Sequence, residues 1–141
     1  MTIKTYDPNQ LSVILGVSAI NGFAEDSMLS IEVEDAQYNI TTDVHGAPTR
    51  FKQNKNIAKV TLTLTQSSSS NNTLSSYIEA DRINNAGVFP LMIKDNSGST
   101  LFTSTNCYIE QIPTTEFGND NKNREWVIIA INPSKFLGGV K

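Results

Sequence analysis

The stretch that decides the fold is residues 57–98, IAKVTLTLTQSSSSNNTLSSYIEADRINNAGVFPLMIKDNSG. It opens with a strictly alternating run, Ile57–Thr65, which is typical of a strand with one buried face. After a polar segment the spacing becomes helical from Thr73 to Ile83, and a second apolar strand follows at Val88–Ile93. The stretch therefore predicts one helix inserted between the strands of a β-rich fold.

The predicted helix covers about residues 72–84. Asn72 and Thr73 are the candidates for its N-cap, and Gly87 follows as a stop signal. One helical face is expected to pack inward, and it carries Leu74, Tyr77, Ile78 and Asp81.

Alternation on either side of this stretch predicts further strands at residues 11–17, 28–34, 101–112 and 124–131. The Asn21–Gly22 pair favours a two-residue hairpin turn. In the second strand the core-facing residues are Leu29, Ile31 and Val33, and the outward residues are Met28, Ser30, Glu32 and Glu34. In the third strand one face holds Thr103, Thr105, Cys107 and Ile109, and Trp126, Ile128 and Ala130 share a face of the last.

The long excursion between the second strand and Ile57 predicts a β-hairpin arm over about residues 38–57, with a turn at His45–Pro48. A structureless loop of that length would be unusual in a compact domain. We expect a mostly β fold, a barrel or sandwich with one short helix and this arm, in one domain over residues 1–141. Core packing is also expected for the tail residues Phe136 and Leu137 and for most aromatic side chains.

Composition excludes several classes of protein. The 141 residues carry a net charge of -3, which argues against general nucleic-acid binding. The single cysteine, Cys107, allows no internal disulfide and is expected to be a small buried hydrophobe. Residues 1–8 contain no apolar h-region, and no apolar run approaches the ~20 residues of a membrane span. We therefore expect neither a secretory signal nor a membrane segment, and folding in a cytoplasm.

No constellation for catalysis or metal binding is present. His45, the one histidine, lies in a Gly/Pro turn without a carboxylate or cysteine at ligand spacing. Glu32 and Glu34 could form a carboxylate pair on one strand face, although a solvated face explains them better. Asp95–Gly98 is a hairpin turn rather than a calcium loop, since Asn106 stands where the bidentate Glu would be. The sequence predicts no enzyme activity, cofactor or metal.

Charges are segregated into two blocks. Residues 25–43 hold six acidic and no basic residues, and residues 44–59 hold four basic and no acidic ones. The two blocks could neutralise each other across the strands of the arm. Alternatively, the basic arm of one copy meets an acidic patch on the next, a head-to-tail contact that closes into rings or continues as filaments.

Four segments, taken together, resemble the inner tail tube proteins of contractile-tailed bacteriophages. They are Thr5–Gln10, Val60–Gln66, Gly87–Gly98, and Glu116–Gly118 followed by Arg124–Trp126. Their order and spacing cover nearly the whole chain, and the element order matches tail tubes and the tube protein of type VI secretion. The resemblance implies a virion protein, assembled in the host cytoplasm, that forms hexameric rings stacked into the tube through which DNA is delivered. It implies contacts with other copies and with sheath, baseplate and terminator proteins, passage of DNA without specific binding, and no membrane.

Within that family the charged residues gain candidate roles. Glu32 and Glu34 become candidates for the lumen or the ring interface, because a lumen that passes DNA should repel phosphate. The arm becomes the candidate stacking element between rings, in interfaces above ~2,000 Å². Its candidate charges are Asp43, Arg50, Lys52, Lys55 and Lys59.

Three alternatives stay open. Within the structural class, a tail terminator or baseplate-type component is the nearest. A monomeric β-sandwich binding module would need an exposed aromatic patch, and a small hydrolase would need a catalytic constellation that the sequence lacks.

Overall fold

The computed structural model describes residues 3–25, 28–33, 36–120 and 122–139. Their elements, in chain order, are the 3-10 helix η1 (Pro8–Gln10), β1 (Leu11–Leu15), β2 (Ser18–Ala19), β3 (Leu29–Val33), β4 (Tyr38–Thr42), β5 (Pro48–Lys52), β6 (Ile57–Thr65), α1 (Ser70–Asn84), β7 (Phe89–Asp95), β8 (Leu101–Gln111), β9 (Asn123–Ile131) and β10 (Ser134–Phe136). The expected mostly β fold with one helix and a hairpin arm is confirmed.

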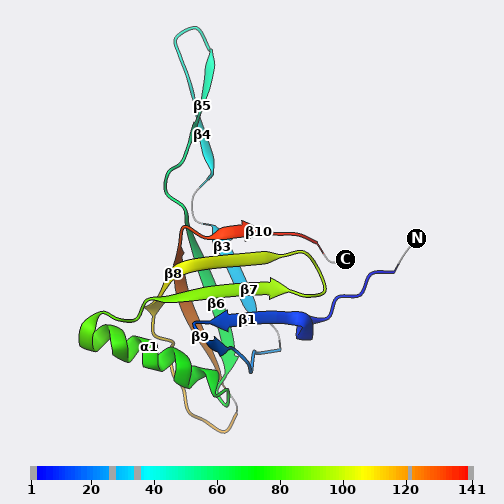
Figure 1. The fold of residues 1–141 in the computed structure, drawn as a ribbon, viewed down its shortest axis with the longest axis vertical. Helices are drawn as coiled ribbons and strands as arrows, with labels where there is room; N and C mark the ends of the chain where they lie inside the picture. Colours follow the sequence, from blue (N-terminus) through cyan, green and yellow to red (C-terminus); the bar gives the residue numbers. More distant parts are fainter. Residues whose placement is uncertain (1–2, 26–27, 34–35, 121, 140–141) are drawn as a thin grey trace.

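One antiparallel sheet makes up the body. Its strand order is β2-β1-β7-β8-β9-β6-β3, and β10 pairs with β8 beside this path. The sheet folds over on itself, so that β1, β7 and β8 run across the direction of β3, β6 and β9 (Figure 1). Helix α1 lies beside the folded sheet, and the β4–β5 hairpin projects away from it.

A β-bulge in β8 contributes to this fold. Phe89 of β7 pairs with Cys107 and Leu91 pairs with Ser104, so two residue steps in β7 span three in β8. The extra residue reverses which side chains of β8 point inward. Ser104 is buried in the first half of the strand and Cys107 in the second. The prediction that Thr103 shares a face with Cys107 is therefore wrong.

The core fills the space between the two halves of the folded sheet. The predicted inward positions of β6 are confirmed, since Val60, Leu62 and Leu64 are fully buried. Strand β9 is buried over five consecutive residues, so its side chains are covered on both faces of the sheet. The fully buried large side chains are Phe89, Phe102, Leu15, Leu62, Leu64, Leu74, Leu91, Ile93 and Ile128.

The helix begins at Ser70, ahead of the predicted caps Asn72 and Thr73, and this prediction is wrong. Tertiary hydrogen bonds, rather than a capping side chain, fix its start. The Ser70 hydroxyl accepts from the amide of Asn21 at 2.9 Å, and the buried Asn71 amide group accepts from Trp126 Nε1 at 2.9 Å. Such long-range partners are invisible in a local sequence pattern.

The inward face of the helix is as predicted, and its last residue, Asn84, matches the predicted end, although the residue that caps it is not Gly87. The Tyr77 and Phe89 rings lie 4.6 Å apart, and Asp81 Oδ1 accepts from the Gly87 amide at 2.8 Å. The C-cap is Asn85, which adopts the left-handed conformation with φ of 58°. Asn tolerates this conformation better than most side chains do, so the helix ends before Gly87.

The first hairpin turn also lies elsewhere than predicted. Strands β1 and β2 are joined at Gly16–Val17, where Gly16 has a φ of 65°. Gly22 has a positive φ too, but its carbonyl accepts from Thr65 of β6 at 2.8 Å. The Asn21–Gly22 segment thus carries the chain across to β6 instead of reversing it.

Several apolar side chains expected in the core are exposed. Phe136 and Leu137 are 65% and 62% exposed, because the tail pairs with the edge of β8 without turning inward. Phe117 is 79% exposed in the loop before β9, and Tyr108 is also on the surface.

Candidate assembly surfaces

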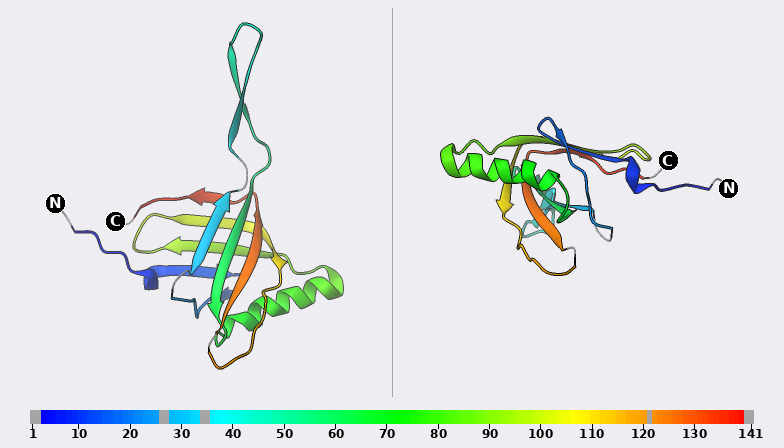
Figure 2. Two further views of the ribbon diagram at one scale, coloured as in Figure 1. Left: turned by 180° about the vertical axis from the view of Figure 1, so that it is seen from behind. Right: turned by 90° about the horizontal axis from the view of Figure 1, so that it is seen from below.

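The arm formed by β4 and β5 is separate from the body. The two strands make their own sheet, with no ladder to the main one, and they project beyond it in two of the views (Figures 1 and 2). All ten strand residues are exposed. An isolated two-stranded hairpin is marginally stable in water. A surface that packs against the arm would therefore stabilise it.

Asp43 builds the tip of the arm. Its carboxylate oxygen Oδ1 accepts from the amides of His45 and Ala47, each at 2.9 Å. Its carbonyl accepts from Gly46, which has a φ of 80°. This is a three-residue hairpin loop closed by a left-handed glycine. The structure thus gives Asp43 and His45 roles in the turn.

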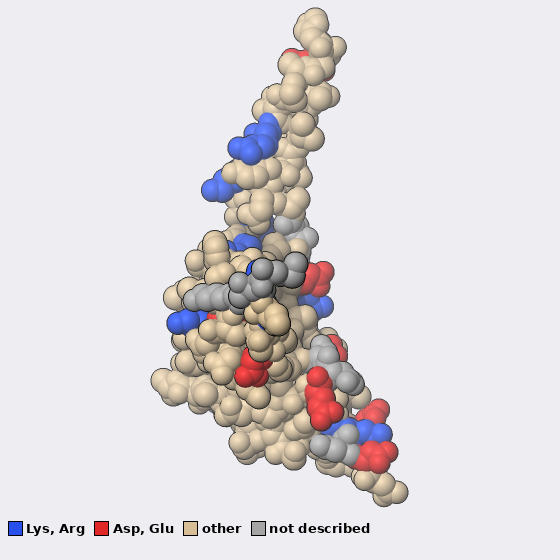
Figure 3. Space-filling view, turned by 90° about the vertical axis from the view of Figure 1, so that its right-hand side faces the viewer, with Lys and Arg blue, Asp and Glu red and all other residues tan. Residues whose placement is uncertain are grey.

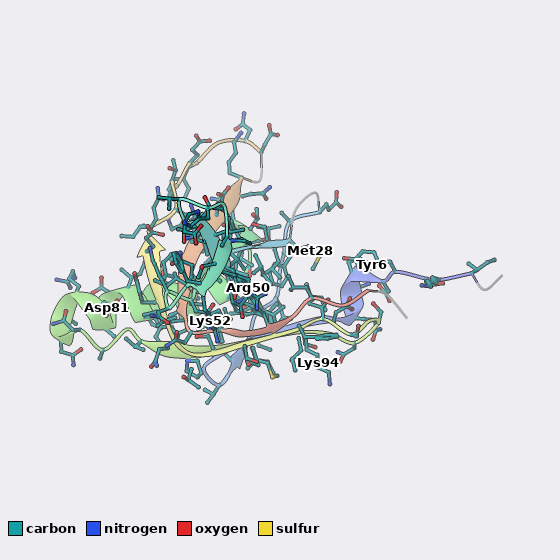
Figure 4. All side chains as sticks on the ribbon, turned by 90° about the horizontal axis from the view of Figure 1, so that it is seen from above. Tyr6, Met28, Arg50, Lys52, Asp81 and Lys94 are labelled. Atoms are coloured by element: carbon teal, nitrogen blue, oxygen red, sulfur yellow. The ribbon has the colours of Figure 1, made fainter. Side chains whose placement is uncertain are left out.

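One face of the arm mixes apolar and basic side chains. Tyr38 pairs with Lys52 and Ile40 pairs with Arg50, and residues directly opposite each other share a face. The Arg50 guanidinium lies over the Tyr38 ring, 4.0 Å from its centroid. Ile40 is 68% exposed. Figure 4 looks down on the arm and labels Arg50 and Lys52. We call these four residues, Tyr38, Ile40, Arg50 and Lys52, the basic face of the arm.

The remaining candidate charges lie elsewhere. Lys59 belongs to β6, not to the arm, and stands directly opposite Glu32 of β3. This pairing fits the alternative in which the acidic and basic blocks neutralise each other across neighbouring strands. Lys55 lies between β5 and β6. Glu32 is exposed, as expected, and Glu34 lies outside the described residues.

The arm and the rest of the chain differ in charge. Residues 36–56 contain three basic residues and one acidic residue, and the rest contains eight basic and 13 acidic residues. In the space-filling view, basic side chains lie along the arm below an acidic group near its tip, and the acidic groups of the lower body lie beside basic ones (Figure 3).

An acidic cleft lies between the end of β8, the segment after it and the start of β9. Its volume is about 360 Å³, and its lining includes Glu116, Glu125 and Val127. Glu116 and Glu125 are exposed. Both residues lie in segments that carry the family resemblance, but neither belongs to the two charge blocks, although residues 110–125 hold four of the 14 acidic residues.

A second groove lies on the outer face of the sheet. Its volume is about 410 Å³, and the register places Ile14, Met92 and Thr103 side by side along it. No charged residue is among those that line it, all of which are described.

The described residues offer little for catalysis. They contain no group of three or more His, Cys, Asp or Glu side chains that could hold a metal ion. Cys107 is buried, and burial raises the pKa of its thiol. In the described part of the chain, no helix is both long and apolar enough to span a bilayer.

Comparison with known proteins gives one relative and several similar folds. Structural protein ORF10 of Pseudomonas phage KPP10 is 36% identical over 147 aligned residues, which cover 96% of this chain and 83% of that protein. No family model matches the sequence.

Three solved structures have a similar fold at low identity. A chain of the cryo-EM structure of the anti-feeding prophage cap (AFP tube terminating cap) has a TM-score of 0.66 at 15% identity, over 96% of this chain and 94% of that one. A chain of the PVC sheath/tube terminator in the extended state has a TM-score of 0.62 at 14% identity, over 97% of this chain and 100% of that one. A chain of the PVC sheath-tube complex, from an extracellular contractile injection system, has a TM-score of 0.63 at 15% identity, over 94% of this chain and 91% of that one.

Proposed function

This chain belongs to the same family of phage structural proteins as ORF10 of Pseudomonas phage KPP10, and we propose that it is a ring-forming subunit of a contractile tail. The observation that carries the proposal is the arm. Its ten strand residues are exposed and, among the strands that the structure describes, pair only with each other. A protein that acts alone gains nothing from a hairpin of marginal stability, whereas a subunit of an assembly can bury it against a neighbour.

A position at the end of the tube is the first candidate. One similar structure is described as a sheath-tube complex, and two are described as a tube terminating cap or a sheath/tube terminator. These descriptions fit the terminator alternative better than the repeating tube subunit. In this role the ring would end the tube at one level of the tail, in contact with tube and sheath proteins.

The repeating tube subunit is the second candidate. The similar chain in the sheath-tube complex supports it, and so does the placement of the arm and the acidic cleft at opposite ends of β6. Surfaces at opposite ends let copies join head to tail without limit. Hexameric rings and passage of DNA through the lumen belong to this proposal, with Glu32 as a candidate lumen residue. The arm, the acidic cleft and Glu32 have structural roles in this proposal, and none of their residues is assigned a catalytic step.

Labelling the protein on phage tails separates the two positions. Gold-labelled antibody should bind at one end of tails whose sheath has been removed if the chain is a terminator. It should bind along the whole length if the chain is the tube subunit, where the copy number by quantitative mass spectrometry is many times higher. Absence of the protein from purified tails would contradict both positions.

A monomeric binding module remains the alternative outside the structural class. The exposed rings of Tyr38 and Phe51 give it some basis, since both lie on the arm. Sedimentation velocity of the purified chain distinguishes the classes. A monomer at every concentration, which binds a surface carbohydrate through these rings, would favour the binding module.

A further inference from the structure

The basic face of the arm and the acidic cleft lie far apart in one molecule. The arm enters β6 at Ile57, whereas Glu125 of the cleft lies opposite Thr63, six residue steps along the strand. At about 3.3 Å per residue, these steps separate Glu125 from the base of the arm by roughly 20 Å. The arm projects in the opposite direction, away from this end of the body (Figures 1 and 2). A chain therefore cannot place its own arm in its own cleft.

The two surfaces are complementary in charge. Arg50 and Lys52 share the basic face of the arm. All residues that line the cleft are described; two of them, Glu116 and Glu125, are acidic and none is basic. Complementary potentials across a contact set its register and exclude wrong partners.

Apolar contacts match as well. Ile112 lines the cleft and is 65% exposed, and Ile40 on the basic face is 68% exposed. Burial of both side chains would remove apolar surface from water. The larger groove beside Met92 fits the arm less well, since its described lining residues carry no charge that could face Arg50.

We propose that the cleft between β8 and β9 receives the arm of a second copy of this chain. Arg50 and Lys52 of one copy then face Glu116 and Glu125 of the next. The contact joins two different surfaces at opposite ends of the molecule, so when it repeats head to tail it closes into a ring or continues as a stack. The inference rests on the proposed function and names the acceptor surface for its arm.

Charge reversal tests the contact in the full-length protein. Arg50→Glu with Lys52→Glu reverses the arm, and Glu116→Lys with Glu125→Lys reverses the cleft. All four side chains are exposed, so the fold should be retained, which circular dichroism checks. Each pair should raise the concentration at half-assembly by about tenfold or more, because like charges then meet. Combining all four changes should restore most of the assembly.

The matched control is Glu79→Lys with Glu25→Lys, which makes the same charge change as the cleft variant at two exposed positions outside both surfaces. It should assemble like the wild type in sedimentation velocity. The inference is wrong if this control loses assembly as strongly as the cleft variant. It is also wrong if the four-change variant assembles no better than either pair alone.

Cross-linking tests proximity without substitutions. A carbodiimide joins a lysine amine to a carboxylate that it touches, and mixing nitrogen-15-labelled with unlabelled protein identifies links between copies. Mass spectrometry should find Lys52 joined to Glu116 or Glu125 of another copy. Links from Lys52 to other carboxylates only, or a wild-type chain that stays monomeric at high concentration, would overturn the inference. Antibody labelling of tails tests the proposed function separately, so failure of one can be told from failure of the other.

Discussion

Two antiparallel strand pairs of this protein, β6–β9 in the body and β4–β5 in the arm, have opposite environments. The β6–β9 ladder runs through nine residue pairs without a break, and its alternate side chains enter the core. The β4–β5 ladder has five pairs, and none of its residues is buried. Burial of apolar side chains therefore stabilises the body within one chain, whereas the described strand residues of the arm are not stabilised in this way.

The comparison predicts that substitutions in the two strand pairs affect different properties of the protein, and experiments can test this. Substitutions in β6–β9 should change the free energy of unfolding and affect assembly only through the fold. Substitutions in the arm should leave unfolding nearly unchanged and affect assembly directly.

The largest effect is expected for Ile128→Ala in β9. Ile128 is fully buried in the core, and truncation of such a side chain costs about 3–4 kcal/mol of unfolding free energy. The matched change in the arm, Ile40→Ala, should cost less than about 0.5 kcal/mol. Urea denaturation of the monomer measures both. Similar costs at the two positions would mean that the arm packs as the body does.

A smaller effect is expected for Asn71→Ala at the start of α1. The Asn71 side chain accepts from Trp126 Nε1 and donates to the carbonyls of Thr65 and Ser68. Its loss leaves buried polar groups without partners, at a cost of about 2 kcal/mol. The control is Asn39→Ala on the exposed strand β4, which should be almost neutral in the same denaturation assay. Equal stability of the two variants would refute the role given to Asn71.

The smallest effect on stability is expected for Asp43→Ala at the arm tip. The change removes two hydrogen bonds that close an exposed turn, so unfolding should shift by less than about 1 kcal/mol. A looser hairpin loses more entropy on binding, so assembly should need a higher concentration. Sedimentation velocity measures this, with Glu25→Ala, at an exposed position outside the arm and the acidic cleft, as the charge-matched control. Normal assembly of Asp43→Ala would show that the tip need not be ordered.

Sequence periodicity was enough for elements that keep one inward face along their whole length. The strict alternation of Ile57–Thr65 matches β6 at both ends, and the excursion before it is the arm. The inward face of the helix was also predictable from its 3.6-residue spacing.

Features that depend on distant partners were not predictable in this way. The bulge in β8 reverses its alternation because of its pairing with β7. The helix starts early because Asn71 meets Trp126, which is 55 residues away. The exposed tail at Phe136 looked apolar enough to be buried, and only its pairing at the sheet edge shows otherwise.

Only the basic half of the proposed contact could be predicted from the sequence. The basic residues Arg50 and Lys52 follow from the charge block, and the structure places both on one face of the arm. The acidic partner expected in residues 25–43 stays a prediction. Asp43 forms the arm tip and Glu32 stands opposite Lys59. Three further acidic residues of this block lie outside the described residues. Glu116 and Glu125 are nine residues apart in the sequence and line one cleft only through the fold of the segment before β9, so the charge blocks did not pair them with the arm.

Hydrogen exchange of the arm amides tests the central claim most directly. In the monomer, amides within residues 39–52 should exchange almost as fast as in an unfolded chain, whereas those of β6 and β9 stay protected. After assembly the arm amides should become protected by about tenfold or more, because a neighbouring copy then covers them. Arm amides already protected in the monomer, or equally fast in the assembly, would contradict the account.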